Sequence, residues 1–491
     1  MWYTYFWNDF INNIGYFFNV AYVVTILVVV LLIVFENRSP LKSISWILMI
    51  TLIPIAGVVL YFFFGQRYQK QILYSRKALR YKRRVNAIAR NQLKELAHVT
   101  VKDMNSKIAE KKDIMSLLLN NDRAFLTHNK NVKILNNGSE TFAELKQAFK
   151  QARHHIHLEF YIFRFDTIGN ELFEILKEKA RQGVEVRIIY DSVGSYKMPR
   201  KKKKEAREHG IRLRSFQKVI FPLLSSKVNY RNHRKLAVID GKIGFTGGIN
   251  IADRYNEKHN PDLYWRDTFV KIEGNAANAL QAIFIDDWFY VSKENIYNDV
   301  YFFEEKESQN NLTQIISSGP DSGWHAISQF YFSAITSSKN YVYIASPYFI
   351  PNDEISFALK AAALRGIDVR ILIPKHSDTF ISRWSTESYI GEMLKAGVKI
   401  YRYTKGFMHS KVVVSDDVMC SIGSANLDYR SLETNFEISA VFYDERIAKE
   451  AAQHFMNDLK QSELVKIDEW KKRPIYKKFT TSFARLFAPL M

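Results

Sequence analysis

Residues 233–250 read HRKLAVIDGKIGFTGGIN, and residues 409–426 read HSKVVVSDDVMCSIGSAN. Each stretch has a His, a Lys two positions later, an Asp five positions after the Lys, a Gly seven positions after the Asp and an Asn three positions after the Gly. A spacing that recurs at all of these positions indicates an internal duplication. We therefore expect two related halves, each ending in one copy of this motif.

The first two matching positions predict where the side chains point. His233 with Lys235, and His409 with Lys411, are two residues apart. Side chains two apart on a β-strand share one face of the strand, so each pair would face the same space. The apolar residues after each Lys are typical of an interior strand.

Brought together, the two halves would supply two imidazoles, two ammonium groups and the side-chain amides of Asn250 and Asn426. This set suits a phosphate diester, because ammonium and amide groups bind the non-bridging oxygens where charge develops. One imidazole can attack phosphorus while the other protonates the leaving oxygen. The lysines supply the positive charge, so we expect no metal and no other cofactor.

The Asp of each copy, Asp240 and Asp416, belongs to the motif and is counted among its catalytic residues. Five positions beyond the Lys, however, each faces the opposite side of an ideal strand. We expect a structural role for both carboxylates behind the strand.

The sequence before each motif alternates between strands and helices in the same order. A strand, a helical stretch and a second strand follow one another at 156–163, 171–181 and 183–191, and again at 341–349, 359–364 and 366–374. This βαβ alternation predicts an α/β fold with mixed sheets flanked by helices. We place a first lobe at 121–300 and a second lobe at 301–491.

Two apolar stretches precede the repeat. Residues 17–35 and 43–64 contain no charged residue, and each is close to the roughly 20 residues that a helix needs to cross a bilayer. Residues 67–84 then carry eight Lys or Arg and no acid, which favours the cytoplasmic side. We expect a multi-pass membrane hairpin over 1–65, a basic juxtamembrane linker over 66–120, and catalytic lobes in the cytoplasm. The alternatives are a signal peptide and a hairpin buried in a soluble core.

The composition limits the partners. The 491 residues carry a formal net charge of +20 and one cysteine, Cys420, which excludes an internal disulfide and a Cys-based zinc site. The charge predicts either nucleic acid or an acidic membrane surface as partner. The apolar stretches favour anionic membrane lipid and disfavour nucleic acid.

Three weaker features have two interpretations each. The basic cluster at 197–207 is either a membrane-facing patch or a solvated helix face. The stretch 470–490, where basic residues precede Phe and Leu at helical spacing, is either an interfacial amphipathic helix or a helix packed on the second lobe. The histidines at 154, 155 and 157 favour ordinary structural roles over a metal site, because no acidic or Cys partner stands at a useful spacing.

The doubled H-x-K-x4-D motif with its trailing G-[GS]-x-N resembles that of the phospholipase D superfamily. The whole chain is similar to the bacterial cardiolipin synthases, including residues 229–235, 265–267, 347–351 and 426–437. One departure is that the first copy has Gly248 where the second has Ser424, which removes one hydroxyl donor.

The resemblance implies a two-step exchange. A histidine takes the phosphatidyl group of one phosphatidylglycerol and releases glycerol, and a second phosphatidylglycerol then attacks to give cardiolipin. It further implies that His233 is the nucleophile, that His409 is acid and then base, and that both lysines bind phosphate oxygens. The carboxylate that orients each imidazole is expected downstream, with Asp267 and Glu437 as candidates.

Two other functions remain open from the sequence. A lipid hydrolase would share the covalent step and differ only in letting water attack. A nuclease of the same superfamily would suit the charge, although it needs no membrane hairpin. The sequence leaves the oligomeric state undetermined, but both halves of the site lie in one chain.

Overall fold

The computed structural model describes residues 16, 20, 22–35, 40–61, 88–96, 106–217, 230–258, 264–303 and 311–488. The chain forms two compact units, Met1–Ser75 with Ile220–Asn229, and Arg76–Val219 with Tyr230–Met491. The first unit contains the apolar N-terminal stretches, and the second contains both copies of the motif.

The described residues of the first unit are helical. Residues 22–35 form a helix, followed by α2 (Pro40–Leu52) and α3 (Pro54–Leu60). Ile33, Ile50 and Tyr61 are buried between them, while most of their other apolar side chains are exposed. None of the described helices is both long and apolar enough to cross a membrane. The membrane hairpin stays a prediction, and the basic run at 67–84 lies outside the described residues.

The second unit is built on one fifteen-stranded mixed sheet, in the order β19-β13-β12-β10-β15-β16-β18-β9-β1-β8-β6-β5-β2-β3-β4. The first lobe contributes β1 (Thr127–Asn136), β2 (His155–Phe160), β3 (Glu185–Asp191), β4 (Arg212–Phe216), β5 (Lys235–Ile239), β6 (Ile243–Gly247) and β8 (Thr268–Gly274). The second contributes β9 (Asn311–Ser318), β10 (Tyr341–Ala345), β12 (Asp368–Pro374), β13 (Lys399–Tyr403), β15 (Val412–Ser415), β16 (Met419–Gly423), β18 (Glu437–Tyr443) and β19 (Ser462–Leu464).

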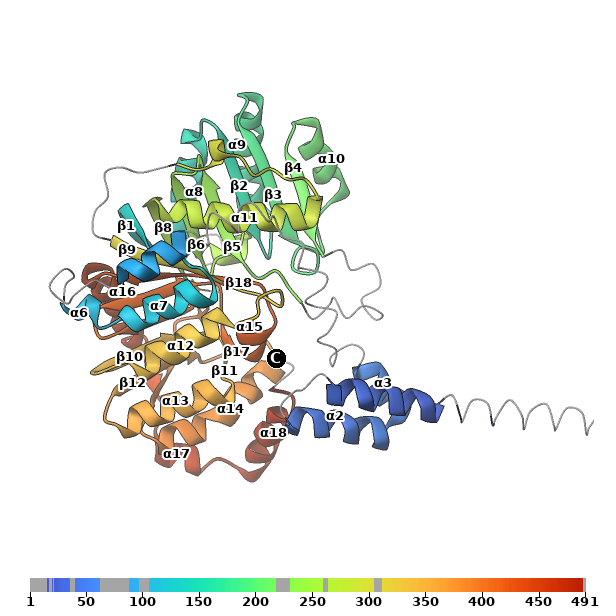
Figure 1. The fold of residues 1–491 in the computed structure, drawn as a ribbon. Helices are drawn as coiled ribbons and strands as arrows, with labels where there is room; N and C mark the ends of the chain where they lie inside the picture. Colours follow the sequence, from blue (N-terminus) through green and yellow to red (C-terminus); the bar gives the residue numbers. More distant parts are fainter. Residues whose placement is uncertain are drawn as a thin grey trace, which may run out of the picture. The chain divides into compact units, whose positions relative to one another are not determined.

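The strand order repeats between the lobes. Strands β2, β3 and β4 are parallel, as are β10, β12 and β13, and the motif strands β5 and β15 pair antiparallel with β2 and β10. Strands β1 and β9 pair antiparallel where the lobes meet, so the two expected sheets are one continuous sheet. The α/β fold with two lobes is confirmed, and Figure 1 shows the first lobe above the second.

Helices cover the sheet in both lobes (Figure 1). The first lobe has α8 (Asn137–Gln151), α9 (Thr167–Arg181), α10 (Arg200–Glu208) and α11 (Ala276–Ser292). The second has α12 (Ala326–Thr336), α13 (Asp353–Leu364), α14 (Phe380–Lys395), α15 (Tyr429–Glu433), α16 (Glu445–Leu459), α17 (Ile467–Lys471) and α18 (Ile475–Arg485). Side-chain caps set several starts: Asp166 caps α9, Asn352 caps α13 and Asp444 caps α16.

Part of the expected linker belongs to the second lobe. Helix α7 (Lys112–Asn121), which follows α6 (Ser106–Ala109), buries Ile114, Met115, Leu118 and Leu119. These side chains share one core with α12, α13 and β10, so α7 is a layer of this lobe. The domain boundaries taken from the sequence stay a prediction.

Candidate active site

Two short parallel strand pairs join the lobes beside the motifs. β7 (Trp265–Arg266) of the first lobe pairs with β14 (Phe407–Met408) of the second, and the His409 N–H donates to the Arg266 carbonyl at 2.7 Å. Because both strands run in the same direction, the residues that follow them, Asp267 and His409, emerge side by side. The distance between Asp267 Oδ2 and His409 Nδ1 is 2.6 Å.

The same arrangement occurs at the other motif. A parallel bridge joins Asn232 to Phe436, and the His233 N–H donates to the Phe436 carbonyl at 2.9 Å. His233 Nδ1 then lies 2.9 Å from Glu437 Oε1. Each imidazole thus contacts a carboxylate of the opposite lobe, and Asp267 lies upstream of its histidine, not downstream as expected.

This contact selects the tautomer of each ring. A buried carboxylate accepts a hydrogen bond from Nδ1–H, so Nε2 becomes the basic nitrogen of each imidazole. Both carboxylates are fully buried, while the side chains of His233 and His409 keep 13% and 10% exposure. The histidines are therefore rigidly oriented and still open to a substrate.

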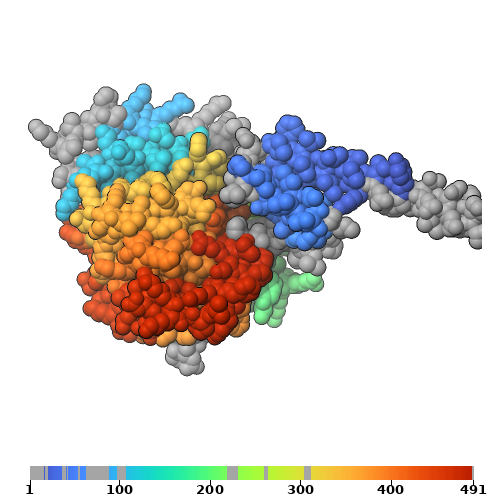
Figure 2. Space-filling model, turned by 90° about the horizontal axis from the view of Figure 1, so that it is seen from below, coloured from blue at the N-terminus to red at the C-terminus, as the bar shows by residue number. Residues whose placement is uncertain are grey.

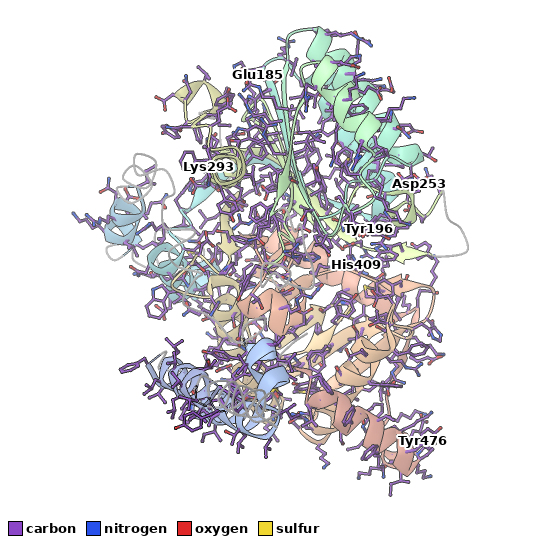
Figure 3. The ribbon with its side chains drawn as sticks, turned by 90° about the vertical axis from the view of Figure 1, so that its right-hand side faces the viewer. Glu185, Tyr196, Asp253, Lys293, His409 and Tyr476 are labelled. Carbon is purple, nitrogen blue, oxygen red and sulfur yellow. The ribbon has the colours of Figure 1, made fainter. Side chains whose placement is uncertain are left out.

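The motif lysines lie beneath the histidines. Lys235 Nζ donates to the His233 carbonyl at 2.6 Å, and Lys411 Nζ donates to the His409 carbonyl and lies 2.9 Å from His409 Nδ1. Both lysines are buried. The two histidines and two lysines form one cluster at the junction of the lobes, where Figure 3 labels His409.

The motif aspartates lie at the far ends of β5 and β15. Asp240 accepts hydrogen bonds from the backbone N–H groups of 153, 154 and 155, and Asp416 accepts them from 339, 340 and 341. Both have positive φ angles, 53° and 56°. The structure places these carboxylates on the backbone at the start of β2 and β10 rather than against either imidazole, which is the arrangement expected of a structural role.

The motif asparagines contact protein partners. Asn250 Oδ1 accepts from the Ile162 N–H at 3.0 Å, and its Nδ2 donates to the Tyr255 hydroxyl at 2.9 Å. Asn426 Nδ2 donates to Asp428 Oδ2 at 3.1 Å. Their phosphate-binding role stays a prediction.

Comparison with known proteins gives separate matches for the N-terminal helices and for the two lobes. The family model described as "Cardiolipin synthase, PLD-like domain" matches residues 145–288 and 331–459, and the model "Phospholipase_D-nuclease N-terminal" matches 20–66. The cardiolipin synthase of Alkalihalophilus pseudofirmus is 39% identical over 477 residues, which cover 96% of this chain and 93% of the relative. The chain belongs to the PLD-like cardiolipin synthase family.

Further relatives agree with this membership. The cardiolipin synthase of Halalkalibacterium halodurans is 38% identical over 476 residues, covering 96% of this chain and 94% of the relative. The crystal structure of phosphatidylserine synthase from Haemophilus influenzae has a TM-score of 0.60 at 13% identity and covers 77% of this chain and 97% of that one. At that identity the structural match shows a shared fold.

In this member of the cardiolipin synthase family, burial and neighbouring charges determine the charge states of the histidines and carboxylates in the site. Burial lowers the pKa of His233, and it lowers the pKa of His409 to about 3 with the help of Lys411. Burial alone would raise the pKa values of Asp267 and Glu437, but the neighbouring lysines and histidines outweigh it and hold both below their usual range. The site thus pairs neutral imidazoles with ionised carboxylates.

The lysines respond to burial as well. Burial lowers the pKa of Lys411 to about 8 and that of Lys235 well below its usual value. A bound phosphate would supply negative charge and favour the ammonium forms again. Burial therefore disfavours the charged forms of both lysines, and a bound anion would offset this effect.

The difference between Gly248 and Ser424 affects both the packing and the hydrogen bonding around the two carboxylates. A Cβ at Gly248 would lie 2.1 Å from Asp267 Oδ1, so the carboxylate occupies the space of a side chain there. In the second lobe the Ser424 and Ser431 hydroxyls donate to Glu437 instead. Glu437 therefore accepts hydrogen bonds from two hydroxyls, and only Ser424 belongs to the motif.

Other supporting residues also escaped sequence reasoning. Arg234 forms a buried salt bridge with Asp287 and donates to the Glu437 carbonyl at 3.3 Å. The Tyr161 ring centroid lies 5.0 Å from that of His233 and 5.5 Å from Lys235 Nζ. Nothing local marks Tyr161 or Asp287, since their roles depend on tertiary contacts.

The histidines at 154, 155 and 157 form a separate cluster. Gln281 Oε1 lies 3.3 Å from His155 Nε2 and 3.2 Å from His157 Nδ1, and the His157 ring stacks on Phe284 at 4.4 Å. These contacts fit the structural interpretation.

Proposed function

We propose that this protein makes cardiolipin by transferring the phosphatidyl group of one phosphatidylglycerol to the glycerol hydroxyl of another, with release of free glycerol. It is an enzyme of the phosphatidyltransferase class by its family membership. The observation that carries the proposal is the pair of imidazoles, each bonded at Nδ1 to a carboxylate of the opposite lobe.

In the first step His233 Nε2 attacks phosphorus and the bond from phosphorus to the glycerol oxygen breaks. His409, protonated on substrate binding, donates its Nε2 proton to that oxygen. The imidazole of His233 becomes cationic in the phosphohistidine, and the ionised Glu437 at its Nδ1 stabilises it. Lys235 and Lys411 bind the non-bridging oxygens.

In the second step His409, now neutral, removes the proton from a hydroxyl of the second phosphatidylglycerol. That oxygen attacks phosphorus, the bond from phosphorus to His233 breaks, and cardiolipin is formed. The choice of His233 as nucleophile rests on the family resemblance, because the two half-sites have nearly the same geometry.

The first unit would hold the catalytic lobes at the membrane that contains both substrates. Residues 20–66 match an N-terminal family model, and the helix at 22–35 and α2 expose apolar side chains that include Leu27, Leu31 and Leu48. A hairpin that spans the bilayer, with cytoplasmic lobes, accounts for this exposure.

Product analysis tests the proposed reaction. Purified full chain is given phosphatidylglycerol labelled in its headgroup, in vesicles with a metal chelator, and the products are read by mass. Cardiolipin with free labelled glycerol is expected. Phosphatidic acid with glycerol would identify a hydrolase, and cleavage of oligonucleotides without lipid turnover would identify a nuclease; either would overturn the proposal.

A further inference from the structure

Helix α18 packs against the second lobe through its small side chains. Its buried side chains are the small ones, Thr481 and Ala484, which lie against α14, where the Ser385 hydroxyl donates to the Ala484 carbonyl at 3.3 Å. Arg485 Nη2 bonds Glu392 at 2.6 Å and fixes the end of the helix. The helix is therefore held by small residues and by an ion pair.

The large apolar side chains of α18 point away from the lobe. Phe479 is 70% exposed, Phe483 is 54% exposed and Leu486, just after the helix, is 73% exposed. The rings of Phe479 and Phe483 stack at 6.4 Å along one face. A solvent-exposed apolar row of this kind marks an interaction site. Leu490, expected on the same face, lies outside the described residues.

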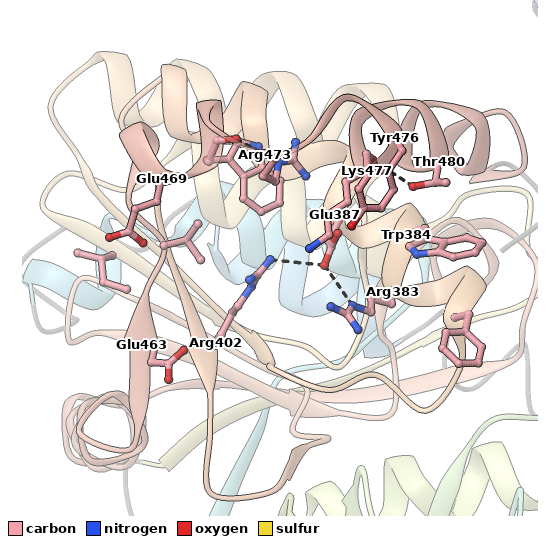
Figure 4. Close-up of a pocket in the computed structure, with 14 residues that line it drawn as sticks. Arg383, Trp384, Glu387, Arg402, Glu463, Glu469, Arg473, Tyr476, Lys477 and Thr480 are labelled. Carbon is pink, nitrogen blue, oxygen red and sulfur yellow. Dashed lines mark hydrogen bonds and ion pairs between the residues drawn. The ribbon is translucent and has the colours of Figure 1, made fainter.

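A cavity of about 670 Å³ opens beside this row, between α14, β13, α17 and α18 (Figure 4). Phe380, Trp384 and Tyr476 form part of its lining, and Phe380 and Tyr476 are 76% and 62% exposed. None of the lining residues belongs to the doubled motif. Figure 3 shows Tyr476 at the lower edge of the second lobe, well away from His409.

The cavity also holds Arg473, which forms no salt bridge within 4 Å among the residues that the structure describes. Arg383 and Arg402 share Glu387, at 3.2 and 3.6 Å, so each of them has a carboxylate partner. The Arg473 guanidinium instead lies 3.3 Å from the centroid of the Trp470 ring, and its buried Nη1 has no hydrogen-bond partner among the described residues. An anion in the cavity would satisfy it.

The segment that carries the row is basic, although the cavity lining also contains Glu387, Glu463 and Glu469, each of which forms an ion pair with an Arg or Lys. Residues 470–491 contain six Lys or Arg and no Asp or Glu, and Lys477 and Lys478 flank the apolar row on exposed positions. In Figure 2 the C-terminal residues form a continuous area on one face of the second lobe. An exposed aromatic row bordered by cations fits an acidic bilayer surface.

We propose that α18 and the start of α14 form a second, non-catalytic contact with the membrane, in which the aromatic row enters the interface and Arg473 binds the phosphate of an acidic phospholipid. This second contact rests on the proposed function in one respect, namely that the enzyme works on a membrane containing acidic lipid. The contact would hold the second lobe against the surface that carries its substrate.

Depth-dependent fluorescence tests the aromatic row without requiring turnover. The full chain with Phe483→Cys is labelled with NBD maleimide in phosphatidylglycerol vesicles, and Gln453→Cys, at an exposed position of α16, is the matched control. Cys420 is buried, so the unmodified chain checks the labelling specificity. Quenching by doxyl lipid at 483 and by aqueous iodide at 453 is expected. Iodide quenching at both positions, or protection of 483 from both quenchers, would place the row in water or against protein and overturn the proposal.

Charge replacement tests the phosphate contact. Arg473→Gln should weaken the apparent affinity for phosphatidylglycerol in vesicles about fivefold, the change expected for one charge at an acidic surface, and Arg473→Lys should restore most of it. Turnover in detergent micelles at saturating lipid should stay unchanged, as it should for the control Lys460→Gln in both assays. Equal loss in micelles and vesicles, or no loss in vesicles, would overturn the role of Arg473. If the chain makes no cardiolipin at all, the fluorescence result still stands by itself.

Discussion

His233 Nδ1 lies 2.9 Å from Glu437 Oε1, although the two residues are 204 positions apart and belong to different lobes. Asp267 and His409 form the matching contact at 2.6 Å across 142 positions. Each lobe thus supplies the imidazole of one such pair and the carboxylate of the other. Neither lobe alone contains a complete half-site, although one chain contains both.

Removing either carboxylate charge should therefore impair the half-site in the opposite lobe. Asp267→Asn leaves the size unchanged but allows the amide to donate to Nδ1, which favours the wrong tautomer of His409. We expect kcat to fall about 10²-fold or more, the usual contribution of acid–base catalysis, with the melting temperature nearly unchanged. Retention of most of kcat would show that Asp267 does not set the tautomer.

The two histidines should behave as one unit. His233→Ala and His409→Ala should each reduce cardiolipin formation to background, and the double variant should be no worse than either single one. Lys460→Gln serves as the unaffected control. A single variant that keeps most of its activity would contradict the shared site.

The pH profile should report Lys411. Burial lowers the pKa of its ammonium group to about 8, and the protonated form is the one that binds phosphate. The value kcat/KM, which reflects the free enzyme, should therefore decline as the pH rises above about 8, whereas kcat should change less because bound phosphate keeps the ammonium charged. In Lys411→Arg this decline should move to higher pH; an unchanged profile would assign it to another group.

Replacing either motif aspartate should lower the stability of the fold more than the catalytic rate. Asp416 also forms a 3.3 Å salt bridge with Lys111, whose side chain is 2% exposed. Asp416→Ala leaves that buried ammonium without a carboxylate, with only Ser337 as acceptor, and should lower the free energy of unfolding by roughly 3 kcal/mol. Asp240→Ala removes only the acceptor of three backbone N–H groups and should cost less. Thermal unfolding in detergent measures both, and kcat of the folded fraction should remain near normal.

The basic helix α10 offers a separate test of membrane attraction. Lys202 bonds Glu205 at 3.0 Å and lies over the rings of Phe165 and Phe173, so it contributes to packing and should be left in place. Replacing the exposed lysines at 201, 203 and 204 by Gln should reduce activity on acidic vesicles severalfold at low salt and little at high salt. Identical salt profiles would exclude this patch from membrane binding.

Much of the molecule follows from local sequence patterns. Short continuous runs of apolar residues predict interior strands such as β5 and β15, and the duplication predicts that their surroundings repeat, because these patterns are local properties of the sequence. Strand periodicity separates His233 and Lys235 from Asp240, which lies at the far end of its strand. The lipid substrate follows from the family resemblance.

Tertiary structure alone decided which residues meet across the lobes. Parallel pairing of β7 with β14 directs Asp267 to His409, and no spacing in the sequence contains that pairing. The orientation of α18 is a similar case: its amphipathic pattern predicts a helix with an apolar face, but packing against α14 selects Ala484 for the interior and leaves Phe483 exposed. Contacts between segments far apart in the chain depend on topology and packing, which local periodicity does not specify.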